Sequence, residues 1–236
     1  MCPGGLEMNR EYTKEQIEQK VKDAVSQSEK LYNLSCVNHQ GCLRGSTEPT
    51  SDYIAKFLLG HLDYIGSGIQ QIRRGKTYMV KHIHKEGASN SNRKEEICAR
   101  NLVFTSHTGA KYGVMIGYQI PLKNSNADKG AGKIDLVSYH ADSNTIFLHE
   151  FKRKESSETL LRCLLEIYTY YSILDRDKFL RDFNLMDAAV VPSVLVCDGS
   201  RQHEHYDGDD YSNVRALMER LNITFHLLEE SCQESS

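Results

Sequence analysis

The amino-acid sequence predicts an α/β fold, in which helices flank a central mixed sheet. Three observations predict it. The segments KIDLVSYH and TIFLHEFK are strand-like and are joined by the short turn ADSN, which is typical of a hairpin. Apolar residues recur at helical spacing before and after this hairpin. Further short apolar runs follow the second of these helices, so strands and helices alternate toward the end of the chain.

Residues 1–90 predict a mainly helical region whose role the sequence does not define. Apolar residues recur at helical spacing over residues 14–32 and 52–65, and capping-box spacing opens the first of these helices. Residues 76–84 predict a strand. The polar segment 86–92 predicts a linker to the rest of the chain.

Residues 91–236 predict a second domain, with the order helix, three strands, helix, strand, helix, strand. Ser156 or Ser157 can cap the long helix after the third strand. Pro192 restricts the paired part of the next strand to residues 193–197, because proline has no N–H to donate. In chain order the predicted elements cover residues 94–104, 111–122, 133–140, 145–152, 156–174, 188–197, 210–221 and 223–229.

The segment HEHYDGDDYS, residues 203–212, is rich in His and Asp. It lacks the ligand spacing of a calcium-binding EF-hand loop. It predicts a polar loop instead, with Asp210 or Ser212 as the cap of the next helix.

Composition and charge exclude some classes of protein. The net charge of the 236-residue chain is -3, which argues against a polycation that coats nucleic acid. No apolar run approaches the roughly 20 residues of a membrane helix. The beginning of the chain lacks the basic and then apolar pattern of a secretory signal. We therefore expect a cytoplasmic protein without a membrane span.

Three charged residues stand at unusual places in the most strand-like segments. Asp135 lies inside an apolar run, and Glu150 and Lys152 end the next one. Burying a charge costs several kcal/mol unless an opposite charge or hydrogen bonds compensate it. Residues two apart on a strand share a face, so Glu150 and Lys152 point the same way and Phe151 points away from them. The hairpin can bring Asp135 close to Glu150.

Two carboxylates that lie this close repel each other unless a positive charge lies between them. Mg²⁺ or Mn²⁺ can supply that charge, because these cations favour carboxylate oxygen. Lys152 would then lie beside the attacking water, where it can orient or deprotonate the water or stabilise charge on a phosphate. Together these residues predict a site that hydrolyses phosphodiester bonds.

The pattern of these residues resembles the PD-(D/E)xK nuclease superfamily, which has the restriction-endonuclease-like fold. It is similar to the subgroup that reads Gly-x-Ile-Asp-Leu and then an apolar strand ending Glu-x-Lys, which includes archaeal Holliday-junction resolvases and the nuclease domains of recombination helicases. Here Gly132, Ile134 and Asp135 fill the first part. The resemblance covers roughly residues 91–200. It implies a core of helix, three strands, helix and strand, and a metal-dependent nuclease activity.

The resemblance also implies roles for individual residues. Asp135 and Glu150 would bind the metal, Mg²⁺ or Mn²⁺. The backbone carbonyl of Phe151 would be a further ligand. Lys152 would be the catalytic lysine.

Two helices can add a residue to this site. The first core helix of the family often carries a glutamate, and Glu95 is our candidate because apolar residues follow it at four and seven positions; Glu96 is the alternative. The helix after the Glu-x-Lys strand often carries Gln, with Tyr four positions later. This chain has Glu166 and Tyr170 there. Glu166 would either add a metal ligand or only pair with Arg162.

Basic side chains offer a path for a nucleic-acid backbone. Residues 70–85 contain several basic residues and no acidic one, and further basic residues flank the site strands. A solvated basic loop is the alternative explanation for this segment. The candidate phosphate contacts are Arg73, Arg74, Lys76, Lys133, Arg153 and Lys154.

The sequence thus predicts a metal-dependent nuclease, with DNA favoured over RNA as the substrate. The alternative is a catalytically inactive protein of the same fold that binds nucleic acid or a protein partner, which the acidic net charge favours slightly. Residues 1–90 could bind a protein partner. A homodimer is a further alternative, because nucleases of this kind often need two sites for two strands.

Overall fold

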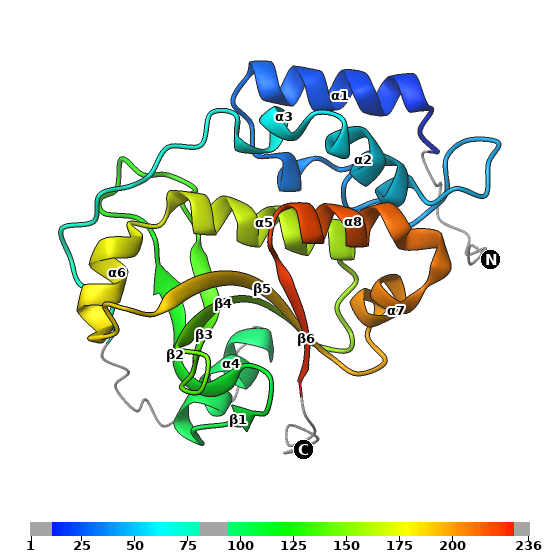
Figure 1. The fold of residues 1–236 in the computed structure, drawn as a ribbon. Helices are drawn as coiled ribbons and strands as arrows, with labels where there is room; N and C mark the ends of the chain where they lie inside the picture. Colours follow the sequence, from blue (N-terminus) through cyan, green and yellow to red (C-terminus); the bar gives the residue numbers. More distant parts are fainter. Residues whose placement is uncertain (1–10, 81–93, 229–236) are drawn as a thin grey trace.

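The computed structural model describes residues 11–80 and 94–228, and its centre is a six-stranded mixed sheet (Figure 1). The strands are β1 (Thr108–Gly109), β2 (Gly113–Pro121), β3 (Lys133–His140), β4 (Thr145–Lys152), β5 (Ala189–Cys197) and β6 (Thr224–Leu228). They lie side by side in their chain order. Neighbours from β1 to β4 are antiparallel, whereas β4–β5 and β5–β6 are parallel pairs. The predicted α/β class with a mixed sheet is therefore confirmed.

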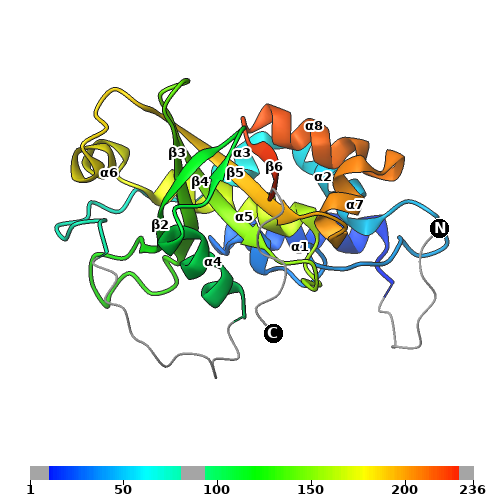
Figure 2. The same cartoon turned by 90° about the horizontal axis from the view of Figure 1, so that it is seen from below.

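Helices cover both faces of the sheet. The helical elements are α1 (Lys14–Ser26), η1 (Leu31–Asn33), α2 (Thr50–Leu59), α3 (Leu62–Gly66), α4 (Lys94–Phe104), α5 (Leu160–Ile173), α6 (Arg176–Phe183), α7 (Arg201–Asp207), η3 (Asp209–Tyr211) and α8 (Ser212–Arg220). In Figures 1 and 2, α5 and α8 lie over one face, α1 to α3 form an outer layer on them, and α4 lies on the opposite face. None of the helices in the described ranges combines the length and apolar character that a membrane span needs.

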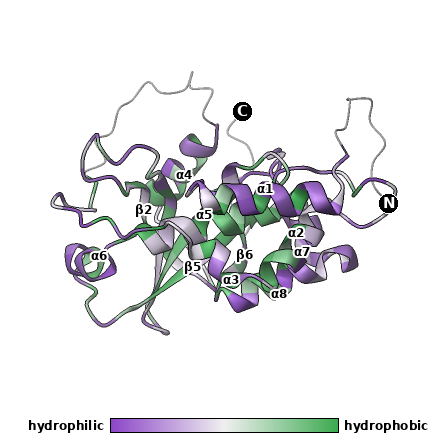
Figure 3. Ribbon diagram, turned by 90° about the horizontal axis from the view of Figure 1, so that it is seen from above, coloured by the Kyte–Doolittle hydropathy of each residue, from purple (hydrophilic) through white to green (hydrophobic). Residues whose placement is uncertain are grey.

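Two hydrophobic clusters fill the space on the two sides of the sheet. The larger cluster joins the sheet to α5, α8 and the N-terminal helices, and the smaller one lies between the sheet and α4. All eight residues of β4 are buried, because this strand lies between the clusters. Leu148 packs into the larger cluster, and Phe147 and Phe151 pack into the smaller one. Figure 3 shows hydrophobic residues on the central strands and hydrophilic residues on the surrounding loops.

The N-terminal helices share the larger cluster with the second half of the chain. Ile17 of α1 and Ile54 and Leu58 of α2 are fully buried in it. Helix α2 also packs along α8. The predicted domain boundary at residue 90 falls within residues 81–93, which lie outside the described residues, so it stays a prediction.

The extents of both predicted N-terminal helices differ from those in the structure. The helix predicted over residues 14–32 ends at Ser26, and Ser28 then adopts a left-handed backbone conformation (φ 54°) that turns the chain away. The capping box predicted at its beginning is confirmed. The helix predicted over residues 52–65 is divided into α2 and α3. The division occurs at Gly60, because glycine is a weak helix former.

Predicted elements of the second half agree more closely with the structure. The helix over residues 94–104 and the strands over residues 133–140 and 145–152 are confirmed to the residue. The polar loop predicted over residues 203–212 is wrong, because α7 and η3 occupy most of it. The strand predicted over residues 76–84 is absent from the part of it that the structure describes.

Pro192 lies inside a paired strand, contrary to the prediction. Strand β5 pairs with β4 along its whole length, with Pro192 opposite Leu148. Pairing with β6 begins only at Ser193. Pro192 therefore lies where β5 has a neighbouring strand on one side only, and there a missing N–H is tolerated.

The beginning of α5 is fixed by the N-terminal region. The cap is Thr159, whose hydroxyl accepts from the N–H of residue 162 (3.2 Å), and the predicted caps Ser156 and Ser157 are wrong. The same hydroxyl donates to the carbonyl of Val37 (2.8 Å), and the N–H of Thr159 donates to Asn38 (2.9 Å). These long-range contacts select the residue that begins the helix.

The N-terminus of α8 is capped by a residue from another helix. The carboxylate of Asp52, on α2, accepts hydrogen bonds from the N–H groups of Asn213 (2.9 Å) and Val214 (3.0 Å), and from the side-chain amide of Asn213 (2.6 Å). The predicted caps Asp210 and Ser212 are wrong. A carboxylate suits this position because the first N–H groups of a helix lack partners within it.

Replacing Asp52 by alanine should lower the free energy of unfolding by about 1–3 kcal/mol, because buried N–H groups would lose a charged acceptor. Urea denaturation measures this change. Asp63→Ala is the matched control, since Asp63 is exposed in the first turn of α3. Equal losses in the two variants would contradict the capping role of Asp52.

A buried hydrogen-bond chain lies behind the strand that carries the site. The hydroxyl of Ser138 donates to the carbonyl of Tyr112 (2.7 Å), so it accepts from Nε2–H of His149 (2.8 Å). Nδ1 of His149 then accepts from the hydroxyl of Ser193 (3.1 Å). Burial lowers the pKa of His149 well below its usual value. His149 is therefore a neutral structural residue beside Glu150.

His226 of β6 lies in the same buried region. Its ring packs against the rings of Phe147, Tyr112 and His149, at centroid distances of 5.0, 5.6 and 6.0 Å. Neither of its ring nitrogens has a hydrogen-bond partner among the described residues. Burial, with a smaller effect from the charge of Lys111, lowers the pKa of His226 to about 4.

Replacing His226 by leucine should make the protein less sensitive to acid. The pKa of histidine is about 6.5 in an unfolded chain, so as the pH falls the unfolded state binds the proton first and stability is lost. Between pH 7 and pH 5 the wild type should lose about 2 kcal/mol more of its free energy of unfolding than His226→Leu. Phe225→Leu changes packing on the same strand without removing a titratable group, so it should behave as the wild type. Equal losses in all three proteins would contradict this account.

Candidate active site

Strands β3 and β4 place two carboxylates and an ammonium on the face of the sheet that α5 covers. The register pairs Leu136 with His149, and continuing it by one residue places Asp135 opposite Glu150. Lys152 lies two residues beyond Glu150 on β4, so the two side chains share a face. The structure thus brings together the three charged residues that the sequence singles out.

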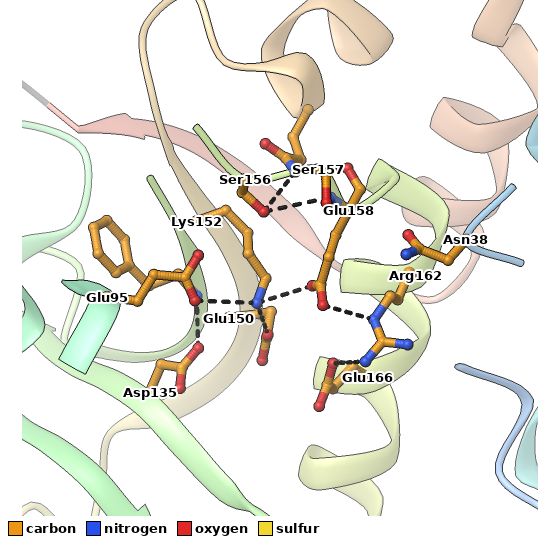
Figure 4. A network of polar contacts seen from close by, with 12 residues as sticks. Asn38, Glu95, Asp135, Glu150, Lys152, Ser156, Ser157, Glu158, Arg162 and Glu166 are labelled. Carbon is orange, nitrogen blue, oxygen red and sulfur yellow. Dashed lines mark hydrogen bonds and ion pairs between the residues drawn. The ribbon is translucent and has the colours of Figure 1, made fainter. Parts of the chain in front are cut away.

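The ammonium of Lys152 is buried among three carboxylates (Figure 4). Its Nζ lies 2.9 Å from Glu150 Oε1, 2.9 Å from Glu158 Oε2 and 3.7 Å from Glu95 Oε2. Only 8% of the Lys152 side chain and 4% of the Glu150 side chain are exposed. The carboxylates come from β4, from the loop before α5 and from α4, so three elements fix this one charge.

A row of polar residues at intervals of four begins with Glu158, just before α5, and continues along one side of this helix. Nε of Arg162 donates to Glu158 Oε1 (2.9 Å), and its Nη2 lies 3.9 Å from Glu166 Oε2. The hydroxyl of Tyr170 donates to Glu166 Oε1 (2.6 Å). Nη1 of Arg162 donates to the backbone carbonyl of Tyr32 in η1 (2.9 Å). A residue of the N-terminal region therefore contacts the site.

Gly132 allows the chain to pass close to this row. Its φ is +81°, and a Cβ at this position would collide with the ring of Tyr170. Only glycine adopts this conformation and leaves room for the ring. This is the physical reason for the glycine that begins the Gly-x-Ile-Asp pattern.

Two donors hold the carboxylate of Asp135. Its Oδ1 accepts from the side-chain amide of Gln119 (3.0 Å), and its Oδ2 accepts from the N–H of Phe151 (3.2 Å). Gln119 has a φ of +50°, a conformation that non-glycine residues rarely adopt. Gln119 is not among the site residues predicted from the sequence, although a polar residue inside an otherwise apolar strand is a usable signal.

A cleft of about 500 Å³ opens onto Asp135 between α4 and the loop that follows β4. Glu95 and Glu96, the two candidates on α4, both line it, and Glu95 Oε2 lies 3.7 Å from Nζ of Lys152. Glu150 and Lys152 are more deeply buried than the residues of the cleft wall. The cleft is lined by Lys94, Glu95, Glu96, Gln119, Asp135, Arg153, Glu155 and Ser156.

Burial changes the acidity of the site residues. It raises the pKa of Asp135 to about 6, although the charge of Lys152 and the N–H of Phe151 oppose this shift. Burial and the charge of Asp135 raise the pKa of Glu150 well above its usual value. Burial by itself would lower the pKa of Lys152, but the charge of Glu150 outweighs it and the pKa is raised. The site thus contains a permanent ammonium and two carboxyls that a further cation would keep ionised.

The charges of the site suit a divalent cation. Five acidic and three basic side chains interact with one another around Lys152. Their net charge is therefore -2 when all the acids are ionised. Single oxygens of Glu150, Glu158 and Glu166 lie within 4.8 Å of one another in the described part of the chain. Carboxylate oxygen is the ligand that Mg²⁺ and Mn²⁺ prefer, so Asp135 and Glu150 are of the right chemical type to bind these cations. The acids are Glu95, Asp135, Glu150, Glu158 and Glu166, and the bases are Lys30, Lys152 and Arg162.

Most of the predicted phosphate contacts lie at the surface. Arg73, Lys76, Lys133 and Lys154 are exposed. Arg153 is partly buried at the cleft and pairs with a neighbouring glutamate, with 3.3 Å between Nη2 and the carboxylate. These five side chains lie where a polyanion could reach them.

Arg74 differs from the other predicted contacts because it is buried. Its guanidinium donates to the carbonyl of Thr77 (3.3 Å and 3.2 Å) and to the carbonyl of Lys123. It also lies over the ring of Tyr78, 5.4 Å from the centroid. This geometry fits a structural role, in which Arg74 joins its own segment to the loop after β2, better than a phosphate contact.

Comparisons of the chain with protein-family models, with curated proteins and with solved structures gave no match. The geometry of the site is therefore the basis for assigning a function. Besides Gln119, that geometry adds Tyr32 and Glu158 to the site residues that the sequence predicts. The backbone carbonyl of Tyr32 leaves no signal in a sequence, whereas Glu158 belongs to the row of residues four apart.

Replacing Asp135 by asparagine should stabilise the protein at neutral pH. The pKa of Asp135 is about 6 in the folded chain, above about 3.9 for an unfolded one, so this carboxyl lowers stability as the pH rises from about 4 to 6. At pH 7.5, in EDTA, Asp135→Asn should unfold with a free energy about 1–2 kcal/mol higher than the wild type. The gain should disappear at pH 4. Asp142→Asn, on the exposed turn of the same hairpin, is the control and should change nothing; a gain that persists at pH 4 would contradict the argument.

Proposed function

We propose that this chain is a metal-dependent nuclease of the PD-(D/E)xK type, which hydrolyses phosphodiester bonds in DNA in preference to RNA. The observation that carries the proposal is the buried Lys152 ammonium beside Glu150, across the hairpin from Asp135 and next to an open cleft. Hydrolysis of a phosphodiester with a metal ion needs carboxylates for the cation and a charged group beside the attacking water. These three side chains can supply both.

The order of elements supports the proposal. Apart from the two-residue strand β1 and the additional helix α6, the order α4, β2 to β4, α5, β5 corresponds to the helix, three strands, helix, strand of the restriction-endonuclease-like core. Strand β5 returns parallel to β4 after the crossover through α5. Asp135 and the Glu150–Lys152 pair lie on adjacent strands of this meander.

Asp135 and Glu150 would hold Mg²⁺ or Mn²⁺, with the backbone carbonyl of Phe151 as a further ligand and Glu95 near it. When bound, the cation supplies a charge that activates the attacking water and stabilises negative charge on the phosphate. The amide of Gln119 and the N–H of Phe151 orient the carboxylate of Asp135 before any cation arrives.

Lys152 acts as a donor rather than as a base. Its pKa is raised by the carboxylate of Glu150, which outweighs the effect of burial, so it keeps its proton at neutral pH. A protonated lysine can hold the attacking water or donate to a phosphate oxygen.

A basic groove beside the site offers a path for the nucleic-acid backbone. The groove, of about 480 Å³, follows the loop between β2 and β3 and is lined by Lys123, Lys129 and Lys133. Segment 73–76 lies against this loop, because its backbone donates to an asparagine of the loop (2.8 Å). Basic side chains in this position would bind phosphates without reading the base sequence.

A cleavage assay with Lys152→Ala tests the proposal. The substrates are duplex, single-stranded and branched DNA, and RNA, each with Mg²⁺, Mn²⁺ or EDTA. We expect cleavage that depends on the metal and falls by at least about 100-fold in Lys152→Ala, while nucleic-acid binding is retained. Lys56→Ala, which removes an exposed lysine from α2, should cleave as the wild type does.

Two results would contradict the proposal. Equal cleavage by the wild type and Lys152→Ala would show that another site, or a contaminant, cuts the substrate. Absence of cleavage in every protein, together with no Mn²⁺ uptake in calorimetry, would favour a catalytically inactive protein that binds nucleic acid or a protein partner.

A further inference from the structure

We infer that Glu158 and Arg162 are positioning residues that fix the ammonium of Lys152 for the proposed reaction. Tyr32, from the N-terminal region, holds this pair in place. The inference rests on the proposed nuclease function. It gives the N-terminal region a part in the site that the sequence does not reveal.

Lys152 needs more than one contact to hold its charge in one place. A lysine side chain has a flexible four-carbon stem, and its ammonium is a point charge without a preferred plane. Glu150 lies on the same strand and contacts the ammonium at 2.9 Å. Glu158 contacts it at the same distance from the loop before α5. Two anchors on different elements restrict the ammonium far more than one does.

Glu158 is itself held at both its side chain and its backbone. Its second carboxylate oxygen accepts from Nε of Arg162 (2.9 Å). Its backbone carbonyl accepts from the side-chain amide of Gln202 (2.7 Å), and its N–H donates to Ser156 (3.4 Å). The carboxylate therefore cannot follow the lysine if the lysine moves.

Arg162 connects this carboxylate to the N-terminal region. Nη1 donates to the carbonyl of Tyr32 (2.9 Å), and the guanidinium lies over the ring of Tyr32, 5.9 Å from the centroid. Tyr32 is buried against α5, and its ring meets the ring of Tyr170 edge to face at 6.0 Å. Because a guanidinium is planar, contacts at separate nitrogens fix its direction.

Two other roles would account for some of these contacts. Glu158 could bind the metal ion, since one of its oxygens lies near those of Glu150 and Glu166. Arg162 could bind a phosphate directly, since 24% of its side chain is exposed. Against the first role, both oxygens of Glu158 already contact cationic side chains of the protein. Each role predicts a different kinetic result.

Steady-state cleavage and Mn²⁺ calorimetry on Glu158→Gln test the inference, since this variant keeps the shape of the side chain and removes its charge. We expect kcat to fall about 10- to 100-fold, KM for the nucleic acid to stay within about twofold, and the Kd for Mn²⁺ within about threefold. Glu219→Gln, on the exposed face of α8, should leave all three unchanged. An unchanged kcat, or a Kd for Mn²⁺ raised more than about tenfold, would overturn the inference.

A double-mutant cycle tests whether Arg162 acts through Glu158. Arg162→Met should lower kcat by a similar factor, and Glu158→Gln/Arg162→Met should be no slower than the slower single variant. If the two losses of kcat multiply in the double variant and KM rises in Arg162→Met, Arg162 contacts the substrate directly. This result would overturn its positioning role. Arg162→Met also provides the test if Glu158→Gln does not fold.

The NMR signal of the Lys152 ammonium gives a readout that needs no activity. In wild-type protein with ε-¹⁵N-labelled lysine, we expect a slowly exchanging ammonium signal that is missing from Lys152→Met. Its hydrogen exchange should become at least about fivefold faster in Glu158→Gln, and unchanged exchange would overturn the inference. Failure of the proposed function would instead appear as a wild type that does not cleave although its ammonium signal depends on Glu158.

Discussion

The buried ion pair between Lys152 and Glu150 is the constraint on which the rest of the site depends. Neither charge is stable alone between a sheet and a helix, and removing one partner leaves the other uncompensated. Helix α4 and the loop before α5 bring two further carboxylates to the same ammonium, which hold it beside Glu150. The arrangement of charges in the site therefore depends on how these elements pack against the sheet.

The N-terminal region helps to hold the elements of the site in place. Its residues contact the second half of the chain through buried polar groups as well as through apolar packing. The carbonyl of Tyr32 orients Arg162. Val37 and Asn38 fix the beginning of α5, and Asp52 caps α8. Each contact satisfies a buried or partly buried donor, so the region supports both the fold and the geometry of the site.

The site departs from local rules that the rest of the fold obeys. Gln119 has a left-handed backbone conformation in a strand, and Asp135 is an acid with a raised pKa in an apolar segment. Such features lower stability, and the two hydrophobic clusters compensate for them. Local strain and uncompensated charge gathered at one cleft are typical of a site shaped for function rather than for stability.

The sequence by itself determined the hairpin of β3 and β4 and the common face of Asp135, Glu150 and Lys152. The two-residue period of a strand and a short turn act over a few residues, so they can be recognised locally. Tertiary structure alone decided which groups meet that face. Tyr32 and Arg162 are 130 residues apart, and Asp52 and Asn213 are 161 apart. Such contacts leave no periodic pattern, because they depend on how the layers pack and, in part, on backbone carbonyls that every residue has.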